Sequence, residues 1–543
     1  MNKLSLLSFG VVIMAMAAGC EPTQPPDLIA RIHFAGAERI SANTNSIAFT
    51  NLFCSAEARA LESQTLDKLS RAPATWFKSK IPPGAGDGMA QLRPLLDDVL
   101  KSEWVFEIRD TANGSPEYAL AIRLNSQRAQ LWQSNLQGLL ESWTRMSAQK
   151  VPGGWQLKKH EPPNLIRVTH ASGDWVVVDC GQNQLTLVHE ILNPSLKRGG
   201  AGAETNWLTA DLDWPRLGKL FPALARFDFP KLELQFVGLD GDLWANGKFI
   251  LAQPLPPLEP WRMPTNIIHQ PLVSFTAVRG IGPWLARQDW ARPYEIQPPP
   301  DQFFIWGLLQ IPFQTFAATP VPNAASALAQ LDGKLSVVFD GRTKSLYLPP
   351  ITTELTNNQI GWRGVPFAAP FVRAWREPAG DFLFGGFFPN TPRSQPLPPE
   401  LFQQLSMPNL VYYHWEVTAT RLKELPQLTQ LLLLITHHKQ FNLETAAGKW
   451  LGRVGPTLGS SVTEITQTGP NELNLRRVSR SGLTALEIVS LVNWLEAANF
   501  PGCDLRLPPP PPLPRPLPKR ALGVSTTPPL VSRPAPVPPA PPH

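Results

Sequence analysis

The 543-residue sequence has few cysteines, few tyrosines and few charged residues. It contains 4 Cys and 5 Tyr, and charged residues make up 17% of the chain. The cysteines are Cys20, Cys54, Cys180 and Cys503, and they form neither a CxxC pair nor a zinc-type spacing. This pattern argues against a structural zinc site. The sequence leaves open whether any of Cys54, Cys180 and Cys503 pair in a disulfide.

The sequence also lacks the short motifs that mark common catalytic sites. A GxSxG nucleophile elbow, an HExxH zinc motif, a phosphate-binding loop and a dinucleotide fingerprint are all missing. We therefore assign no catalytic residue, no metal ligand, no cofactor and no ligand-binding residue from the sequence. Because catalytic groups can assemble in space from distant positions, the absence of motifs disfavours an enzyme without excluding one.

The body of the protein has no strong surplus of basic residues. The chain has 49 basic and 43 acidic residues, for a formal charge of +6. Five of the basic residues are Lys3 and the four within the Pro-rich segment 508–543, namely Arg515, Lys519, Arg520 and Arg533. The remainder is nearly neutral, whereas surfaces that bind phosphate backbones are strongly basic. We therefore expect no nucleic-acid partner.

A short apolar run lies at the N-terminus. Residues 4–19 carry no charge, but a membrane-spanning helix needs about 20 residues. Lys3, the short apolar run and the small residues at its end are typical of a secretory signal peptide. We predict a signal peptide over residues 1–19.

The end of this run, Ala17-Ala18-Gly19-Cys20, resembles the lipobox of bacterial lipoproteins. That family usually has Leu where this chain has Ala17. The resemblance implies that Cys20 is the lipidation site and that acyl chains anchor the protein in a membrane. Since Glu21 follows rather than Asp, it also implies the outer membrane, facing the periplasm, although the sorting rule varies between bacteria.

Proline is about twice as frequent as usual, with 60 residues in the chain. Residues 508–543 hold sixteen of them in thirty-six positions. Proline lacks a backbone N–H and fixes φ, which excludes helix and sheet there. We expect a disordered, basic tail that spans about 110 Å when fully extended as polyproline II. Its functional interpretation is a docking segment for an envelope protein or a cell-wall partner.

A second Pro-rich stretch, residues 252–268, predicts a linker between two halves. The expected halves are residues 31–251 and 269–507, and residues 20–30 connect the lipidated cysteine to the first half. Short patterns recur between the halves in the same order. The pairs are 154–155 with 361–362, 165–167 with 371–373, 173–176 with 380–383, and 212–220 with 417–425. Their offsets, between 205 and 207 positions, predict an internal repeat.

Each half mixes strand and helix patterns. Strand patterns cover 117–124, 173–179, 231–237 and 409–417, and helix patterns cover 125–146 and 484–499. Asn125 or Ser126 is expected to cap the first of these helices. No regular alternation of strand and helix is present. We predict an α+β fold of two related halves, with mainly antiparallel sheets packed by helices and a disordered Pro-rich C-terminal tail.

Two acidic pairs, Asp211 with Asp213 and Asp240 with Asp242, and one histidine pair are candidate sites. Asp211 and Asp213 share one face of a predicted strand, and we interpret them as helix-capping or solvated residues rather than a catalytic pair. Asp240-Gly241 between two strand patterns predicts a hairpin turn. His437 and His438 are neighbours on a helical pattern, point about 100° apart and are not expected to bind a metal.

Tryptophan is abundant, with 18 residues. Trp104, Trp155, Trp175 and Trp415 lie in strand patterns and are expected in the core. Trp261, Trp284 and Trp290 lie in Pro-rich or loop-like sequence, where a flat aromatic face is suited to stacking on sugars.

As a whole the chain resembles large envelope lipoproteins of unknown activity, which implies a location and no chemistry. We expect a lipid-anchored cell-envelope protein that acts as a non-enzymatic binding or scaffold protein. The alternatives are a hydrolase of envelope glycan or peptide and a carrier of a hydrophobic ligand.

Overall fold

The computed structural model describes most of the chain between Leu28 and Gly502. The described residues are 28–79, 81–110, 116–158, 165–171, 174–181, 206–222, 224–225, 229–269, 271–287, 296–309, 314–332, 352–356, 358–363, 369–388, 399–423 and 444–502. Cys20, Trp290, His437, His438, Cys503 and the tail 508–543 lie outside the described residues.

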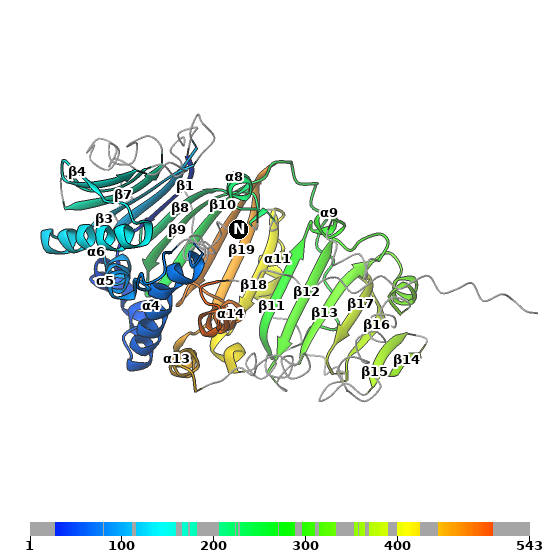
Figure 1. Cartoon of the computed structure of the whole chain (residues 1–543). Helices are drawn as coiled ribbons and strands as arrows, with labels where there is room; N and C mark the ends of the chain where they lie inside the picture. Colours follow the sequence, from blue (N-terminus) through cyan, green and yellow to red (C-terminus); the bar gives the residue numbers. More distant parts are fainter. Residues whose placement is uncertain are drawn as a thin grey trace, which may run out of the picture.

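Twenty strands of the described chain form one antiparallel sheet (Figure 1). The first half contributes β1 (Leu28–Phe34), β2 (Trp104–Arg109), β3 (Glu117–Arg123), β4 (Gln149–Val151), β5 (Gly154–Lys158), β6 (Leu165–Ala171), β7 (Trp175–Gly181), β8 (Leu208–Asp213), β9 (Lys231–Leu239) and β10 (Asp242–Ile250). The second half contributes β11 (Leu272–Arg279), β12 (Gln302–Leu308), β13 (Thr315–Val321), β14 (Thr352–Thr356), β15 (Gln359–Arg363), β16 (Phe371–Glu377), β17 (Gly380–Gly386), β18 (Leu410–Glu416), β19 (Ser461–Gly469) and β20 (Glu472–Ser479). With its helices, this confirms the predicted α+β class with an antiparallel sheet.

The strand order of the second half is the same as that of the first. Neighbours in the first half run β4-β5-β6-β7-β3-β2-β1-β8-β9-β10. In the second half they run β14-β15-β16-β17-β13-β12-β11-β18-β19-β20. β10 pairs with β20, so the two halves form one sheet with β4 and β14 at its outer edges.

The paired sequence segments lie on corresponding elements. They fall on β5 and β15, on β6 and β16, at the starts of β7 and β17, and at the ends of β8 and β18. The two strands at the junction pair at equivalent positions of the two halves. Asn246 of β10 lies opposite Arg476 of β20, which is 230 positions later in the chain. The hairpin turns before these strands, Asp240-Gly241 and Pro470-Asn471, are also 230 positions apart. This register places a local two-fold axis at the β10–β20 pair.

The predicted turn at Asp240-Gly241 is confirmed. β9 and β10 form a two-residue hairpin, and the φ angles of Asp240 and Gly241 are 54° and 82°. Positive φ at both central residues is the signature of the type I′ turn, whose twist matches that of the flanking strands.

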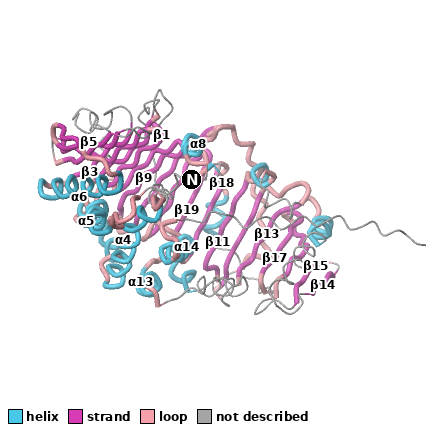
Figure 2. The backbone as a smooth tube through the Cα atoms, viewed as in Figure 1, coloured by secondary structure: helices cyan, strands magenta, loops and turns pink. Residues whose placement is uncertain are grey.

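The helices lie mainly beside the first half and the junction (Figure 2). They are α2 (Ala37–Ser41), α3 (Ile47–Asn51), α4 (Ala56–Trp76), α5 (Met89–Lys101), α6 (Ser126–Thr144), α8 (Trp214–Leu220), α9 (Gly282–Leu285), α11 (Pro399–Leu405), α13 (Ala446–Val454) and α14 (Ala485–Glu496), with short 3₁₀ turns η2 (Thr44–Ser46) and η5 (Gly455–Thr457). The predicted helix after Asn125 is confirmed as α6, because the Asn125 side chain accepts a hydrogen bond from the Arg128 N–H and caps the helix.

Helices of both halves share one apolar cluster at the junction. Leu61 of α4 packs with Leu451 of α13 and Val489 of α14. Trp450 Nε1 of α13 donates a hydrogen bond of 2.9 Å to the Leu52 carbonyl oxygen. A helix inserted after β1 therefore buries apolar surface against the second half, and the two halves are held together by packing as well as by strand pairing.

The Pro-rich segment between the halves is partly built into the second core. Met263, Ile267 and Ile268 are buried with strand residues such as Phe304 and Trp306. β1 begins at Leu28, within the segment expected to be a linker. A proline-rich stretch forms no strand ladder, but its apolar side chains still gain free energy by covering a sheet.

We predict that Gly247 is required for close approach of the two halves. A methyl group on Gly247 would overlap Cβ of Leu475 on β20, and overpacking of this kind costs about 1–3 kcal/mol. Thermal or urea unfolding of Gly247→Ala should show that loss. Gly452→Ala is the matched control, because a Cβ there meets no atom within 4 Å and removing a helical glycine stabilises by about 0.5–1 kcal/mol. Equal stability of Gly247→Ala and the wild type would contradict the prediction.

Candidate functional site

Two rows of polar residues cross β11, β18, β19 and β20 on one face. One row is Ser274, Glu416, Ser461 and Ser479, and the other is Thr276, His414, Thr463 and Arg477. Directly opposite residues of paired strands point to the same face, so all eight side chains share it. The alternating residues Phe275 and Tyr413 point to the other face and pack in the core of the second half.

The corresponding rows of the first half are apolar. They consist of Ala30, Leu212, Leu232 and Phe249, and of Ile32, Ala210, Leu234 and Gly247. Six of these eight are buried in the core of the first half. Burying polar groups costs free energy unless they find hydrogen-bond partners. The polar rows therefore distinguish β11 and β18–β20 from their counterparts, and they are the candidate site.

His414 lies between a hydroxyl group and a carboxylate. Thr276 Oγ1 is 2.8 Å from His414 Nδ1, and His414 Nε2 is 3.4 Å from Glu416 Oε2. The second contact lacks hydrogen-bond geometry. The ring of Tyr412 stacks near that of His414, at 6.4 Å and 23°, and burial raises the pKa of Tyr412 to about 12.

Glu416 fastens the start of α14 to the sheet. Its side chain is buried, with a residue exposure of 3%. Its Oε1 accepts hydrogen bonds from the Ala485 N–H at 2.6 Å and from Thr418 Oγ1 at 3.0 Å. Burial acts to raise the pKa of Glu416, but the contact with His414 and the hydrogen bond from the Ala485 N–H outweigh it, so the pKa lies below its ordinary value. An ionised carboxylate at a helix N-terminus is also stabilised by the helix dipole.

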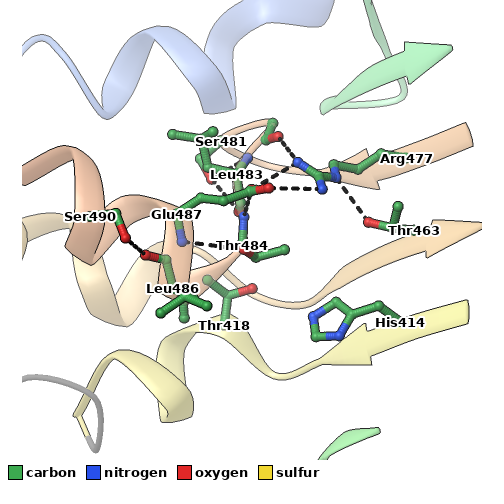
Figure 3. A network of polar contacts seen from close by, with 12 residues as sticks. His414, Thr418, Thr463, Arg477, Ser481, Leu483, Thr484, Leu486, Glu487 and Ser490 are labelled. Atoms are coloured by element: carbon green, nitrogen blue, oxygen red, sulfur yellow. Dashed lines mark hydrogen bonds and ion pairs between the residues drawn. The ribbon is translucent and has the colours of Figure 1, made fainter. Parts of the chain in front are cut away.

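Arg477 makes the second connection between the sheet and α14 (Figure 3). Its Nε donates to Thr463 Oγ1 at 2.9 Å, and its two terminal nitrogens bond both carboxylate oxygens of Glu487, at 2.8 Å and 3.1 Å. Glu487 also accepts from the Thr484 N–H at 2.8 Å and completes a capping box with Thr484. The polar rows thus hold α14 by charge-assisted bonds at its first turn.

Two hydroxyl groups beside Glu416 have no such role. Ser461 and Ser479 are 0% and 2% exposed and lie directly opposite each other. Neither Oγ has a hydrogen-bond partner among the described residues. The row that contains Glu416 therefore has hydrogen-bonding groups beyond those that hold α14.

The order Thr276, His414, Glu416 matches the order nucleophile, base and acid. Two features argue against catalysis. Glu416 is engaged by α14, and an open pocket of about 390 Å³ lies elsewhere, at the start of β18. Its lining residues are Leu258, Pro408, Asn409, Gln467, Thr468 and Gly469. Asn409 is seven residues from Glu416 along the chain, which is about 23 Å in an extended strand.

The structure shows the contacts of Asp213 and the strand neighbours of Asp211, the acidic pair predicted from the sequence. Asp213 caps α8 by accepting from the Arg216 N–H at 3.1 Å, which confirms the capping interpretation. Asp211 lies across from Arg31 and Glu233 on neighbouring strands. Within the described part of the chain, no three His, Cys, Asp or Glu side chains are grouped to hold a metal ion.

The described cysteines and tryptophans divide into buried and exposed groups. Cys54 and Cys180 form no disulfide within the described part of the chain. Trp104, Trp155 and Trp175 are buried, as predicted, and Trp415 is half-buried. Trp284 is 42% exposed. Trp261 is covered by the guanidinium group of Arg279, 4.6 Å from its ring, so this face is already occupied by a cation–π contact.

Sequence reasoning missed the polar rows. Their one local signal is the alternation Tyr412, His414, Glu416 in a strand pattern, which places three polar-tipped side chains on one face. No helix among the described residues is long and apolar enough to span a membrane. Comparisons with protein-family models, with curated proteins and with solved structures found no match for this chain, so its function is inferred from its own residues.

We predict a pH-dependent contribution of Glu416 to stability. Its pKa in the fold is below the ordinary value of 4.5, so the carboxylate stabilises the fold fully above that value. The contribution is lost as the pH falls through the lower, folded pKa. Glu416→Gln should lose about 1–3 kcal/mol at neutral pH, and the difference from the wild type should shrink in acid. Urea unfolding across this range measures both.

The control for Glu416→Gln is Glu464→Gln on the adjacent strand. Glu464 pairs with the exposed Arg476 at 3.6 Å, and exposed pairs contribute about 0–1 kcal/mol. A Glu416→Gln deficit no larger than that of the control, or one that does not change with pH, would show that Glu416 does not hold α14.

Proposed function

We propose that the chain is a lipid-anchored protein of the bacterial cell envelope that binds or scaffolds a partner. The location is supported by the lipobox-like Ala17-Ala18-Gly19-Cys20 behind a short apolar run. The role is supported by one structural observation above all. The polar rows of the sheet use their charges to fasten α14, with Glu416 and Arg477 bonded to the first turn of that helix.

We further propose that the two halves arose by duplication and then diverged. The same order of ten strands in each half supports a common origin, as do the four segment pairs on corresponding elements. The rows that are apolar in one half and polar in the other support divergence. Duplicated units joined edge to edge provide a long, continuous surface, which suits a scaffold better than a single enclosed active site.

The Pro-rich tail 508–543 is proposed as a docking segment for an envelope or cell-wall partner. It supplies four basic residues and no acidic residue. Proline-rich segments bind grooves with little loss of conformational entropy, because their extended conformation is already restricted.

The anchor is tested by mass spectrometry of the mature N-terminus from the native host. We expect Cys20 to be the first residue of the mature protein and to carry acyl chains. The Cys20→Ala variant should be lost from the membrane fraction. Acylation adds about 0.8 kcal/mol of membrane affinity per buried CH₂ group, so the change in partition should be nearly complete. A mature protein that begins elsewhere, or is unmodified, would refute the anchor.

A hydrolase is the second candidate, and the alignment of Thr276, His414 and Glu416 favours it. Treatment of the purified protein with a fluorophosphonate probe, which reacts with activated hydroxyl groups, distinguishes a hydrolase from a scaffold. The scaffold proposal predicts no covalent adduct. An adduct on Thr276 that disappears in the isosteric Thr276→Val and in His414→Ala would instead establish an activated hydroxyl group.

A further inference from the structure

The N-terminal end of β1 is tied to α8 at one end of the sheet. Arg216 Nη1 donates a hydrogen bond of 2.9 Å to the Leu28 carbonyl oxygen, and Arg216 Nη2 forms an ion pair of 3.1 Å with Asp110 Oδ2. β1 is antiparallel to β8, with Ala30 opposite Leu212, so Leu28 lies beside the residues that lead from β8 into α8. The chain from Cys20 therefore joins the folded body next to α8.

Beside the Arg216–Asp110 ion pair, the described part of α8 and of its connection to β9 exposes apolar residues and one lysine. We define the α8 rim as the exposed residues of α8 and of its connection to β9. They are Pro215, Lys219, Pro222, Ala225 and Phe229. Phe229 is 49% exposed and packs edge-on against Trp214, at 5.2 Å and 83°. Surfaces that enter a membrane interface combine exposed aromatic and apolar side chains with lysine or arginine. The α8 rim has both kinds of residue.

The tether between the anchor and the body is short. Leu28 is eight residues after Cys20, and eight residues span at most about 28 Å. An acylated Cys20 lies at the bilayer surface, so the end of β1 that carries Leu28 stays within that distance. The α8 rim adjoins Leu28 and is therefore among the described surfaces that the tether holds near the lipid.

We propose that the α8 rim docks on the lipid bilayer, with Phe229 in the interfacial layer and Lys219 directed to anionic headgroups. This inference rests on the proposed lipid anchor and adds an orientation to it. The sheet then stands with the α8 end of β9 at the membrane and the other end away from it. β9 has nine residues, which separates its ends by about 27 Å.

The test places an environment-sensitive fluorophore at each end of that strand. Phe229→Cys labels the α8 rim, and Leu239→Cys, at a residue 41% exposed, labels the far end as a matched control. Cys54, Cys180 and Cys503 are changed to Ser, and Cys20 is kept for acylation in the host. The purified acylated protein is reconstituted at one copy per phosphatidylglycerol-containing vesicle, with spin-labelled lipid as the quencher.

We expect the label at position 229 to lose about half of its fluorescence, because side chains at an interface lie about 5–10 Å deep. The label at position 239 should be unchanged. Pro222→Cys provides a second rim position that should behave like Phe229→Cys. Circular dichroism checks that each variant is folded.

The outcomes separate the inference from the proposed function. Equal quenching at 229 and 239, or quenching at neither in an acylated protein, overturns the orientation and leaves the anchor intact. A protein that lacks acyl chains by mass spectrometry refutes the anchor itself. A change in the emission wavelength of the label at 229 that occurs without lipid quenching, and only when several copies share a vesicle, would assign the rim to a second copy of the chain and overturn docking on lipid.

Discussion

The hydrogen-bonded pairing of β10 with β20 is the constraint on which the architecture depends. It joins two ten-stranded halves at equivalent strands, with Asn246 opposite Arg476. A strand with an unpaired edge is prone to association, and this pairing covers one such edge from each half at once. The helical cluster of α4, α13 and α14 then packs beside the seam. Backbone pairing sets the register, and apolar burial supplies much of the free energy that holds it.

The two halves have the same strand order, so a difference between corresponding strands needs its own explanation. The rows that are apolar in the first half are polar in the second. In the first half, β10 is followed by the Pro-rich segment, whereas β20 is followed by α14, whose N-terminus lies over the polar rows. A helix N-terminus presents unpaired N–H groups, so a carboxylate below it is favourable where a leucine would leave those groups unsatisfied. By strand register, Glu416 of the second half occupies the row position that Leu212 occupies in the first. The sequence repeat differs here by one position, because it pairs Leu212 with Val417.

Helix caps and a hairpin turn could be predicted from short stretches of the sequence. The Asn125 cap, the Asp213 cap and the Asp240-Gly241 turn depend on contacts within three residues, and the structure has all three. The composite site was not readable in this way. His414 and Glu416 are two residues apart and hint at a polar face, but nothing near them in the chain identifies Thr276 as a neighbour.

The sequence by itself determined the periodicities, caps and turns, and with them the mixture of strands and helices, because those features follow from neighbouring residues. Only the tertiary structure decided which strands pair. That pairing brings Thr276, His414, Thr463 and Arg477 into one row across four strands. Their separations in sequence span about two hundred positions. Contacts of that range depend on the register of the whole sheet, in which a slip of one residue would turn every side chain to the opposite face.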